Sequence, residues 1–118
     1  MSTHHEKKQP VPLEGKALSL APLVQYQDHS IVSREIYSKP IGNMTLFAFD
    51  ADQGLSEHSA PFDALVYLLE GQATITLGGN PIPISAGELV LMPATIPHAV
   101  TAVSKFKMAL IMFRATRP

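Results

Sequence analysis

Proline and glycine divide this chain into short segments, and no other feature of the sequence constrains its fold as strongly. Ten prolines and seven glycines are distributed among 118 residues. Proline ends or kinks a helix because it has no backbone N–H and its ring clashes with the preceding turn. The segments between these residues are rich in Val, Ile, Thr, Phe and Tyr, which favour extended strands. The sequence therefore predicts an all-β domain.

Short runs with strand propensity recur along the chain and are separated by turn signals. Glycines at 71, 78–79 and 87 mark turns, since glycine tolerates positive φ angles. Prolines bound residues 93–97, which are expected to form a loop. Segment 98–113 fits both strand and helix spacing, and we expect a strand because a sheet must pair or cover its edges. The other predicted strands are 16–20, 30–38, 44–50, 64–70, 72–77, 81–85 and 89–92.

These strands are expected to form two packed sheets, as a sandwich or a small barrel. Continuous apolar runs such as 64–69 suit strands that are covered on both faces. A hydrophobic fraction of 46% supports one packed core at this length. We expect residues 1–15 to be a flexible lead-in and residues 16–118 to be a single domain.

Charge and cysteine content make several classes of protein improbable. The net charge is −1, so the chain has no basic surplus for binding a nucleic-acid backbone. It has no cysteine, which excludes disulfides and thiolate chemistry and fits a reducing cytoplasm. No apolar run approaches the ~20 residues that span a bilayer, and residues 1–12 lack the apolar core of a secretory signal. We therefore expect a cytoplasmic protein that binds neither nucleic acid nor membrane.

Three histidines outside the lead-in are candidates for chemistry. His58 and His98 lie where predicted strands meet loops, which is where a barrel opens into a pocket. An imidazole can bind a metal, transfer a proton or make a simple hydrogen bond. The plainer interpretation of this pair is two neutral histidines with satisfied hydrogen bonds near the barrel mouth. His29 lies in the polar stretch 25–30, and we expect it to be an exposed loop residue.

The segment from residue 87 to residue 98 resembles the second characteristic motif of the cupin superfamily. That motif reads glycine, five residues, proline, one residue, glycine, two residues, histidine, three residues, asparagine. Gly87, Pro93 and His98 match it. Thr95 stands where glycine is usual, and Ala102 stands where asparagine is usual.

Part of the first cupin motif precedes it in the expected order. That motif contains two histidines one residue apart, then a glutamate, then a glycine. With Gly71 as the glycine, His58 matches the first histidine, whereas Ala60 and Ala64 stand at the second histidine and the glutamate. The resemblance covers residues 40–113. It is strongest to small single-domain cupins of the type-2 conserved-barrel kind, through the His-x-Ala-Pro-x-Asp-Ala-Leu signature at 58–65.

The resemblance implies a jelly-roll barrel of six to eight strands, also called a double-stranded β-helix or RmlC-like fold, which is often dimeric. It also implies a metal site of three histidines and one glutamate, of which this chain keeps only His58 and His98. We expect an incomplete site that holds one divalent ion weakly, among Zn, Ni, Fe, Mn and Cu. Asp63 and Glu57 neighbour the ligand positions, but adjacent side chains on a strand point to opposite faces. We therefore expect both to be surface or loop-capping carboxylates.

Four functions are compatible with these residues. The first is binding of a small organic ligand in the barrel pocket, with His58 and His98 as polar groups and Met92 and Met108 in the lining. The second is a metal-dependent enzyme of the dioxygenase, isomerase or decarboxylase type with an atypical third ligand. A metal-free acid–base catalyst and an accessory protein with a vestigial pocket are the others. We favour the first, although methionines at these positions are more often core residues.

A homodimer is also expected. Segment 17–37 precedes the family-like region and could add strands to a neighbouring chain. The alternative is that this segment covers its own barrel. The sequence alone does not decide whether the protein is an enzyme.

Overall fold

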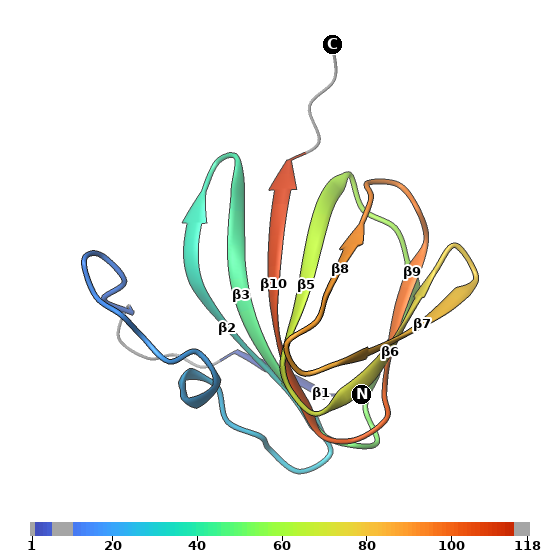
Figure 1. Ribbon diagram of the computed structural model, residues 1–118, viewed down its shortest axis with the longest axis horizontal. Helices are drawn as coiled ribbons and strands as arrows, with labels where there is room; N and C mark the ends of the chain where they lie inside the picture. Colours follow the sequence, from blue (N-terminus) through green and yellow to red (C-terminus); the bar gives the residue numbers. More distant parts are fainter. Residues whose placement is uncertain (1, 6–10, 115–118) are drawn as a thin grey trace.

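The strands of this chain form two sheets that pack face to face as a jelly-roll barrel (Figure 1). The computed structural model describes residues 2–5 and 11–114. The larger sheet has six strands in the order β1-β2-β3-β10-β5-β8, and the smaller has four in the order β4-β9-β6-β7. The elements are β1 (Ser2–His5), η1 (Ala21–Leu23), β2 (Ser30–Lys39), β3 (Gly42–Phe49), β4 (Gly54–His58), β5 (Phe62–Glu70), β6 (Gln72–Leu77), β7 (Asn80–Ser85), β8 (Leu89–Met92), β9 (His98–Ala102) and β10 (Phe106–Arg114).

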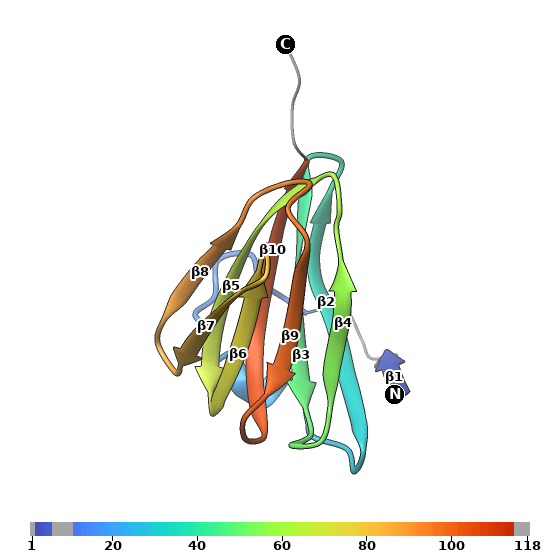
Figure 2. The same cartoon turned by 90° about the vertical axis from the view of Figure 1, so that its right-hand side faces the viewer.

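The predicted all-β fold is confirmed. In Figure 2 the smaller sheet lies in front of the larger one, so that the chain closes into two layers. No helix in residues 2–5 and 11–114 is long and apolar enough to cross a membrane.

Glycine makes the tight connections between strands, as predicted. Gly71 joins β5 to β6 with φ 81°, and a Cβ atom there would collide with the carbonyl oxygen of Lys105 and with Phe106. Gly78, Gly79 and Gly87 also have positive φ angles in the turns after β6 and β7. Gly78 and Gly79 form the turn of the β6–β7 hairpin, whereas Gly71 and Gly87 let the chain cross from one sheet to the other.

The main core fills the space between the two sheets. Phe49 and Phe106 stack with ring centroids 4.4 Å apart, and both are fully buried. Burying a side chain of this size contributes roughly 1.5–3 kcal/mol to stability. Other buried members are Ile31, Ala64, Val66, Leu68, Ala73, Ile75, Ile84, Met92, Val100 and Met108.

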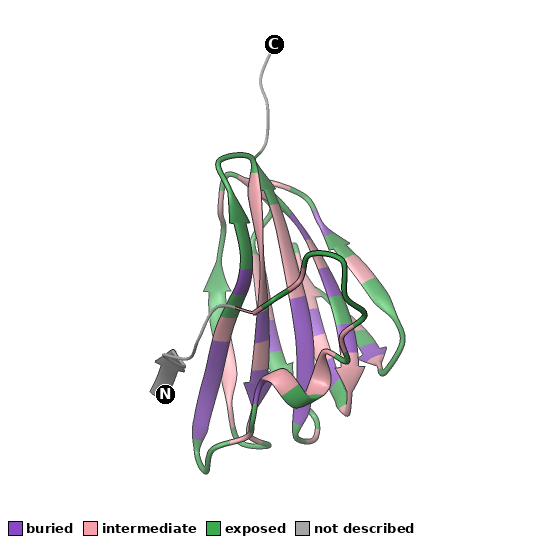
Figure 3. Cartoon of the chain, turned by 90° about the vertical axis from the view of Figure 1, so that its left-hand side faces the viewer, coloured by how far each residue is buried: buried purple, intermediate pink, exposed green. Residues whose placement is uncertain are grey.

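A second core lies on the outer face of the larger sheet, beneath residues 11–26, which we call the N-terminal strap (Figure 3). Val24 is fully buried there. The buried Lys107 donates a hydrogen bond from Nζ to the carbonyl of Ala21 at 2.8 Å. The Tyr26 hydroxyl donates to Glu70 Oε2 at 2.7 Å, and burial together with this carboxylate raises the pKa of Tyr26. The strap is thus fastened to the sheet by both apolar and polar contacts.

The prediction of a strand at 16–20 is wrong. These residues run across the outer face of the sheet without pairing and lead into η1, where Pro22 lies in the first turn. Leu20 packs onto the outer core of the sheet, so this apolar residue covers a surface and does not belong to a strand. Within one chain, segment 17–37 therefore covers its own barrel, and the homodimer stays a prediction.

The strand inventory also differs from the expectation. β4 was not predicted, because its five residues include one large apolar side chain and end in polar ones. The two sheets together contain more strands than the six to eight that the resemblance implies, since β1 and β2 extend the larger sheet. β1 pairs in parallel with β2 and lies inside the segment 1–15 that we expected to be a lead-in, whose flexibility stays a prediction.

Candidate functional site

The two histidines singled out in the sequence meet in the smaller sheet. His58 ends β4, His98 begins β9, and the two are direct partners across the antiparallel strands. Their Nε2 atoms are 3.1 Å apart, and the ring centroids are 4.3 Å apart at an interplanar angle of 66°. The expected convergence of the two imidazoles is confirmed, and the pair is open to solvent because His58 is exposed.

Backbone carbonyls fix the tautomer of both rings. His58 Nδ1 is 2.9 Å from the carbonyl oxygen of Ser56, and His98 Nδ1 is 3.3 Å from that of Ile96. A carbonyl oxygen can only accept a hydrogen bond, so we assign the proton to Nδ1 in both rings. When both rings are neutral, two lone pairs on Nε2 therefore face each other. A cation held between them would remove this unfavourable contact.

His98 is the less accessible of the two rings. Its burial lowers the pKa of His98, and the positive charge of a protonated His58 lowers it further, while the bond to Ile96 opposes the shift. A neutral ring with its lone pair on Nε2 is the form that a metal ion requires.

The loop that leads into His98 is tied to the segment that follows His58. The backbone N–H of Thr95 donates to the carbonyl of Ala60 at 2.8 Å, and that of Ala94 donates to Asp63 Oδ1 at 2.8 Å. Asp63 is therefore a loop-capping carboxylate, as expected. Thr95 has φ 71°, so the left-handed backbone of the motif's usual glycine persists with a β-branched residue.

One of the two positions that lack a ligand atom, Ala64, is filled by core packing. Ala64 is 5% exposed and belongs to the main core, where it pairs across the sheet with Met92 and Met112. Met92 and Met108 are buried members of the same core, and their contact with a ligand stays a prediction. Among the described residues, no third imidazole or carboxylate converges on the histidine pair.

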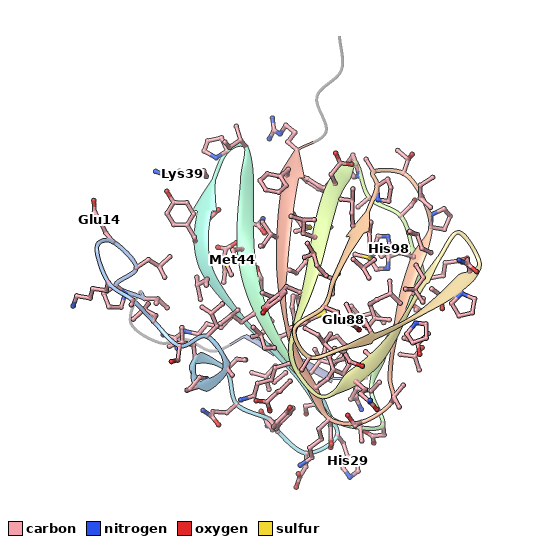
Figure 4. All side chains as sticks on the ribbon, in the orientation of Figure 1. Glu14, His29, Lys39, Met44, Glu88 and His98 are labelled. Atoms are coloured by element: carbon pink, nitrogen blue, oxygen red, sulfur yellow. The ribbon has the colours of Figure 1, made fainter. Side chains whose placement is uncertain are left out.

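A second group of possible ligands lies away from the pair. His29, Asp50 and Asp52 each place one donor atom within 4.8 Å of the others. Figure 4 shows His29 beyond the lower ends of the strands, on the side away from His98. The group could hold a cation, but its atoms already bond to each other. His29 Nδ1 is 2.6 Å from Asp52 Oδ2, and the backbone N–H of His29 donates to Asp50 Oδ2 at 2.7 Å.

These contacts shift the acidities of all three side chains. The hydrogen bond and the charge of Asp52 raise the pKa of His29, and the bond to His29 lowers the pKa of Asp52. Bonds from the backbone of His29 and Ala51 lower the pKa of Asp50. Sequence reasoning identified His29 as an exposed loop residue but missed its acidic partners. The antiparallel pairing of β2 with β3, which brings residues 30 and 50 together, is the information it lacked.

Comparison with known proteins agrees with this fold. The family model "Cupin domain" matches residues 45–114. A conserved protein of unknown function from Streptococcus pyogenes is 30% identical, with a TM-score of 0.82, over 95% of this chain and 100% of that chain. A cupin superfamily protein from Desulfitobacterium hafniense is 27% identical, with a TM-score of 0.81, over 89% and 95% of the two chains.

A cupin 2 conserved barrel domain protein from Leptotrichia buccalis is 40% identical, with a TM-score of 0.79, over 81% of this chain. The matched region is 47% of that protein, so this chain spans about half of its length. A search of curated proteins gives no match. The family model and the identities of these relatives show that this chain belongs to the cupin superfamily.

Proposed function

We propose that this cupin binds a small organic ligand at the barrel mouth through one weakly held divalent ion on His58 and His98. The observation that carries the proposal is the 3.1 Å separation of the two Nε2 atoms of His58 and His98. Two nitrogens that bind one tetrahedral zinc ion at about 2.05 Å lie about 3.3 Å apart. The pair therefore fits two adjacent ligand positions of Zn, and with a small adjustment those of Ni, Fe, Mn or Cu.

The chain's own residues would hold and orient the ion. The carbonyls of Ser56 and Ile96 fix the rings with Nε2 toward the shared position, which is how outer contacts usually orient metal-binding histidines. A bound ion would act as a Lewis acid and template for the ligand. Ala60 and Ala64 offer no side-chain donor, and two neutral imidazoles leave the charge of the ion uncompensated. These features favour a ligand that supplies oxygen atoms and negative charge, such as a small carboxylate.

Metal titration tests this proposal directly. Calorimetry with Ni²⁺ and with Zn²⁺ is expected to give one site per chain in the micromolar range. His58→Ala and His98→Ala should each weaken binding at least tenfold, because each leaves a single imidazole. His29→Ala is the matched control and should leave this affinity unchanged. No saturable binding to the natural chain, or equal binding by both variants, would show that the proposal is wrong.

A metal-dependent enzyme of the dioxygenase, isomerase or decarboxylase type is the second candidate. The exposed position of His58 favours it, because substrate could reach an ion there. It requires a third protein ligand, and among the described residues none lies at the pair. Elemental analysis separates the two functions. One tightly held metal per chain after purification without added metal would favour the enzyme.

We also propose that the protein works in the cytoplasm as a homodimer. The lack of cysteine supports a reducing compartment. The exposed Leu89 and Leu91 on the edge strand β8 support self-association. Sedimentation that gives a monomer at micromolar concentration would exclude the homodimer.

A further inference from the structure

A concave site lies on the outer face of the larger sheet, and the two histidines take no part in it. Its volume is about 410 Å³. That volume falls in the range of small-molecule pockets, roughly 300–1,000 Å³. We call this site the outer groove. It is lined by Leu13, Tyr37, Lys39, Ile41, Gly42, Asn43, Met44, Ile111, Met112 and Phe113.

Three separate parts of the chain shape the outer groove. Met44 of β3 and Ile111 of β10 are direct cross-strand partners, so they share the outer face and form its floor. Leu13 of the strap forms one wall, and Ile41 in the β2–β3 turn forms another. At Gly42 a Cβ atom would collide with the carbonyl of Met112, so glycine allows the hairpin to lie close against β10.

The strap leaves this end of the sheet uncovered. Figure 3 shows the strap crossing the lower and middle part of the outer face, while the far ends of the strands extend beyond it. Large apolar side chains are exposed there: Tyr37 is 51%, Ile41 is 73% and Phe113 is 47% accessible. Apolar side chains gathered in a concavity indicate a binding surface, whereas single exposed ones do not.

The charge at the rim has one sign. Among residues 11–114, Lys39 is the one charged residue that lines the outer groove, and none of the lining residues in that range is aspartate or glutamate. Its Nζ is 5.7 Å from the centre of the Tyr37 ring, which holds the cation beside the apolar floor. Figure 4 shows Lys39 at the end of β2 and Met44 on β3. Arg114 follows Phe113, and its backbone N–H donates to Ile41 at 2.8 Å, so a second cationic residue adjoins the rim.

We propose that the outer groove binds an amphipathic anion, namely a carboxylate with an unbranched alkyl or aromatic tail. The tail would lie on Met44, Ile111 and Phe113, and the carboxylate would pair with Lys39. An ammonium at the edge of an apolar cavity complements such a ligand in both charge and polarity. This inference goes beyond the proposed metal function. The outer groove lies on the outer face of the larger sheet, whereas the histidine pair lies in the smaller sheet, and the two sites share no residue.

Binding of straight-chain carboxylates tests the inference. Calorimetry with hexanoate, octanoate and decanoate below their micellar concentrations should give one site, with affinity that increases by up to about fourfold for each added methylene, as full burial of that group predicts. Backbone amide shifts in NMR spectra should move for Ile41, Met44 and Phe113. Lys39→Gln should weaken the binding of decanoate severalfold and leave the binding of the neutral analogue decanol unchanged. The reason is that only decanoate has a negative charge to pair with Lys39.

Matched variants distinguish the outer groove from other apolar surface. Ile41→Glu should weaken decanoate at least tenfold. Val103→Glu is the control, since Val103 is an aliphatic residue that is 61% exposed in the β9–β10 turn, and it should bind as the natural chain does. His98→Ala should also bind normally, which separates this test from that of the metal function. Ile41→Ser serves as a milder second variant, and circular dichroism establishes that each variant is folded.

Several results would overturn the inference. It is wrong if decanoate does not bind, if affinity is independent of chain length, or if amide shifts move around His58 and His98 instead. It is also wrong if Ile41→Glu and Val103→Glu weaken binding equally. A dimer that Ile41→Glu dissociates, together with no decanoate binding, would show that a second copy of the chain fills the outer groove.

Discussion

At the scale of single residues, the histidine pair combines a reduced set of side-chain ligands with the backbone of the family motif. Alanine at 60 and 64 removes two donor atoms that the family's metal site contains, whereas His58 and His98 still face each other at 3.1 Å. Thr95 keeps the positive φ of a glycine position. The loop that leads into His98 therefore has the backbone geometry of the motif, although two of its usual ligand positions are alanine.

Thr95→Gly is expected to stabilise the protein. A left-handed conformation costs a residue with a side chain roughly 1–2 kcal/mol, and glycine avoids this cost but loses more chain entropy on folding, roughly 0.5–1 kcal/mol. The net gain should be about 0.5–1 kcal/mol in the free energy of unfolding, measured by urea denaturation. Thr95→Ala is the control and should not give this gain, because alanine keeps the strained backbone. Equal stability of the glycine and alanine variants would contradict the explanation.

The pair of His29 and Asp52 makes the loop before β2 sensitive to pH. The pKa of His29 is raised, so its contribution to stability is complete below about 6.5 and is lost as pH rises through the raised value. The pKa of Asp52 is lowered, so its contribution is present above about 3.8 and is lost as pH falls through the lowered value. The ion pair therefore exists at pH values between the lowered pKa of Asp52 and the raised pKa of His29.

Asp52→Asn should return the pKa of His29 toward its ordinary value near 6.5. The reason is that the asparagine side chain keeps an oxygen that can accept a hydrogen bond from His29 but carries no negative charge. An NMR titration of the His29 ring protons measures the change, and Asp28→Asn serves as a control at a neighbouring carboxylate that is not bonded to the ring. An unchanged His29 titration in Asp52→Asn would mean that the contact at 2.6 Å does not persist in solution.

At the scale of elements, the strap behaves as a cover that the sheet needs. It supplies Val24 to the outer core, and Lys107 and Tyr26 fasten it through buried polar contacts. These bonds satisfy groups that would otherwise lose hydration without compensation.

Val24→Ala should lower the free energy of unfolding by about 2 kcal/mol, because two buried methyl groups are removed and a small cavity remains. Hydrogen exchange should show faster exchange in residues 11–26 before the rest of the barrel opens. Val103→Ala is the exposed control and should change stability by less than about 0.5 kcal/mol. Uniform loss of protection across all strands would mean that the strap does not open separately.

Strand propensity predicted most elements of the fold because their apolar residues lie between clear turn signals. Residues 72–77 and 89–92 form strands with the predicted bounds. Segment 98–113 forms two strands, β9 and β10, and not the single strand expected, because residues 103–105 turn the chain from one sheet to the other. The predicted strand at 16–20 is wrong because an apolar side chain that covers a sheet gives the same sequence pattern as one that belongs to a strand. β4 was missed because most of its side chains are polar and accessible.

The candidate site needed more than periodicity. The convergence of His58 and His98 came from a family resemblance, since residues forty positions apart cannot be brought together by local pattern. The acidic partners of His29 and the three-part outer groove depend on strand pairing that the sequence does not state. Local sequence patterns thus predict most of the strands. The contacts between distant segments become known only when the pairing of those strands is known.

At the scale of the whole molecule, the free edge of the larger sheet is the surface that best suits the proposed homodimer. Leu89 and Leu91 on the edge strand β8 are 56% and 52% exposed, and Tyr67 lies opposite Leu89 on β5. An apolar edge strand is a template for pairing with another chain.

The double variant Leu89→Lys/Leu91→Lys is expected to sediment as a monomer at concentrations where the natural chain is a dimer. Two charges on each partner would repel each other across the contact and would have to be desolvated. Val103→Lys, which adds a charge to an exposed turn away from this edge, should stay dimeric. A double variant that remains a dimer would place the contact on another surface.

The position of β10 affects how the chain can be made. It lies between β3 and β5 in the middle of the larger sheet, although every other strand precedes it in sequence. Its pairing of Phe106 with Phe49 joins distant parts of the chain, and non-local pairing of this kind slows folding. During translation, therefore, the larger sheet cannot be completed until β10 has left the ribosome, because β3 and β5 both pair with it. Premature termination before residue 106 would yield a product with no route to the native barrel.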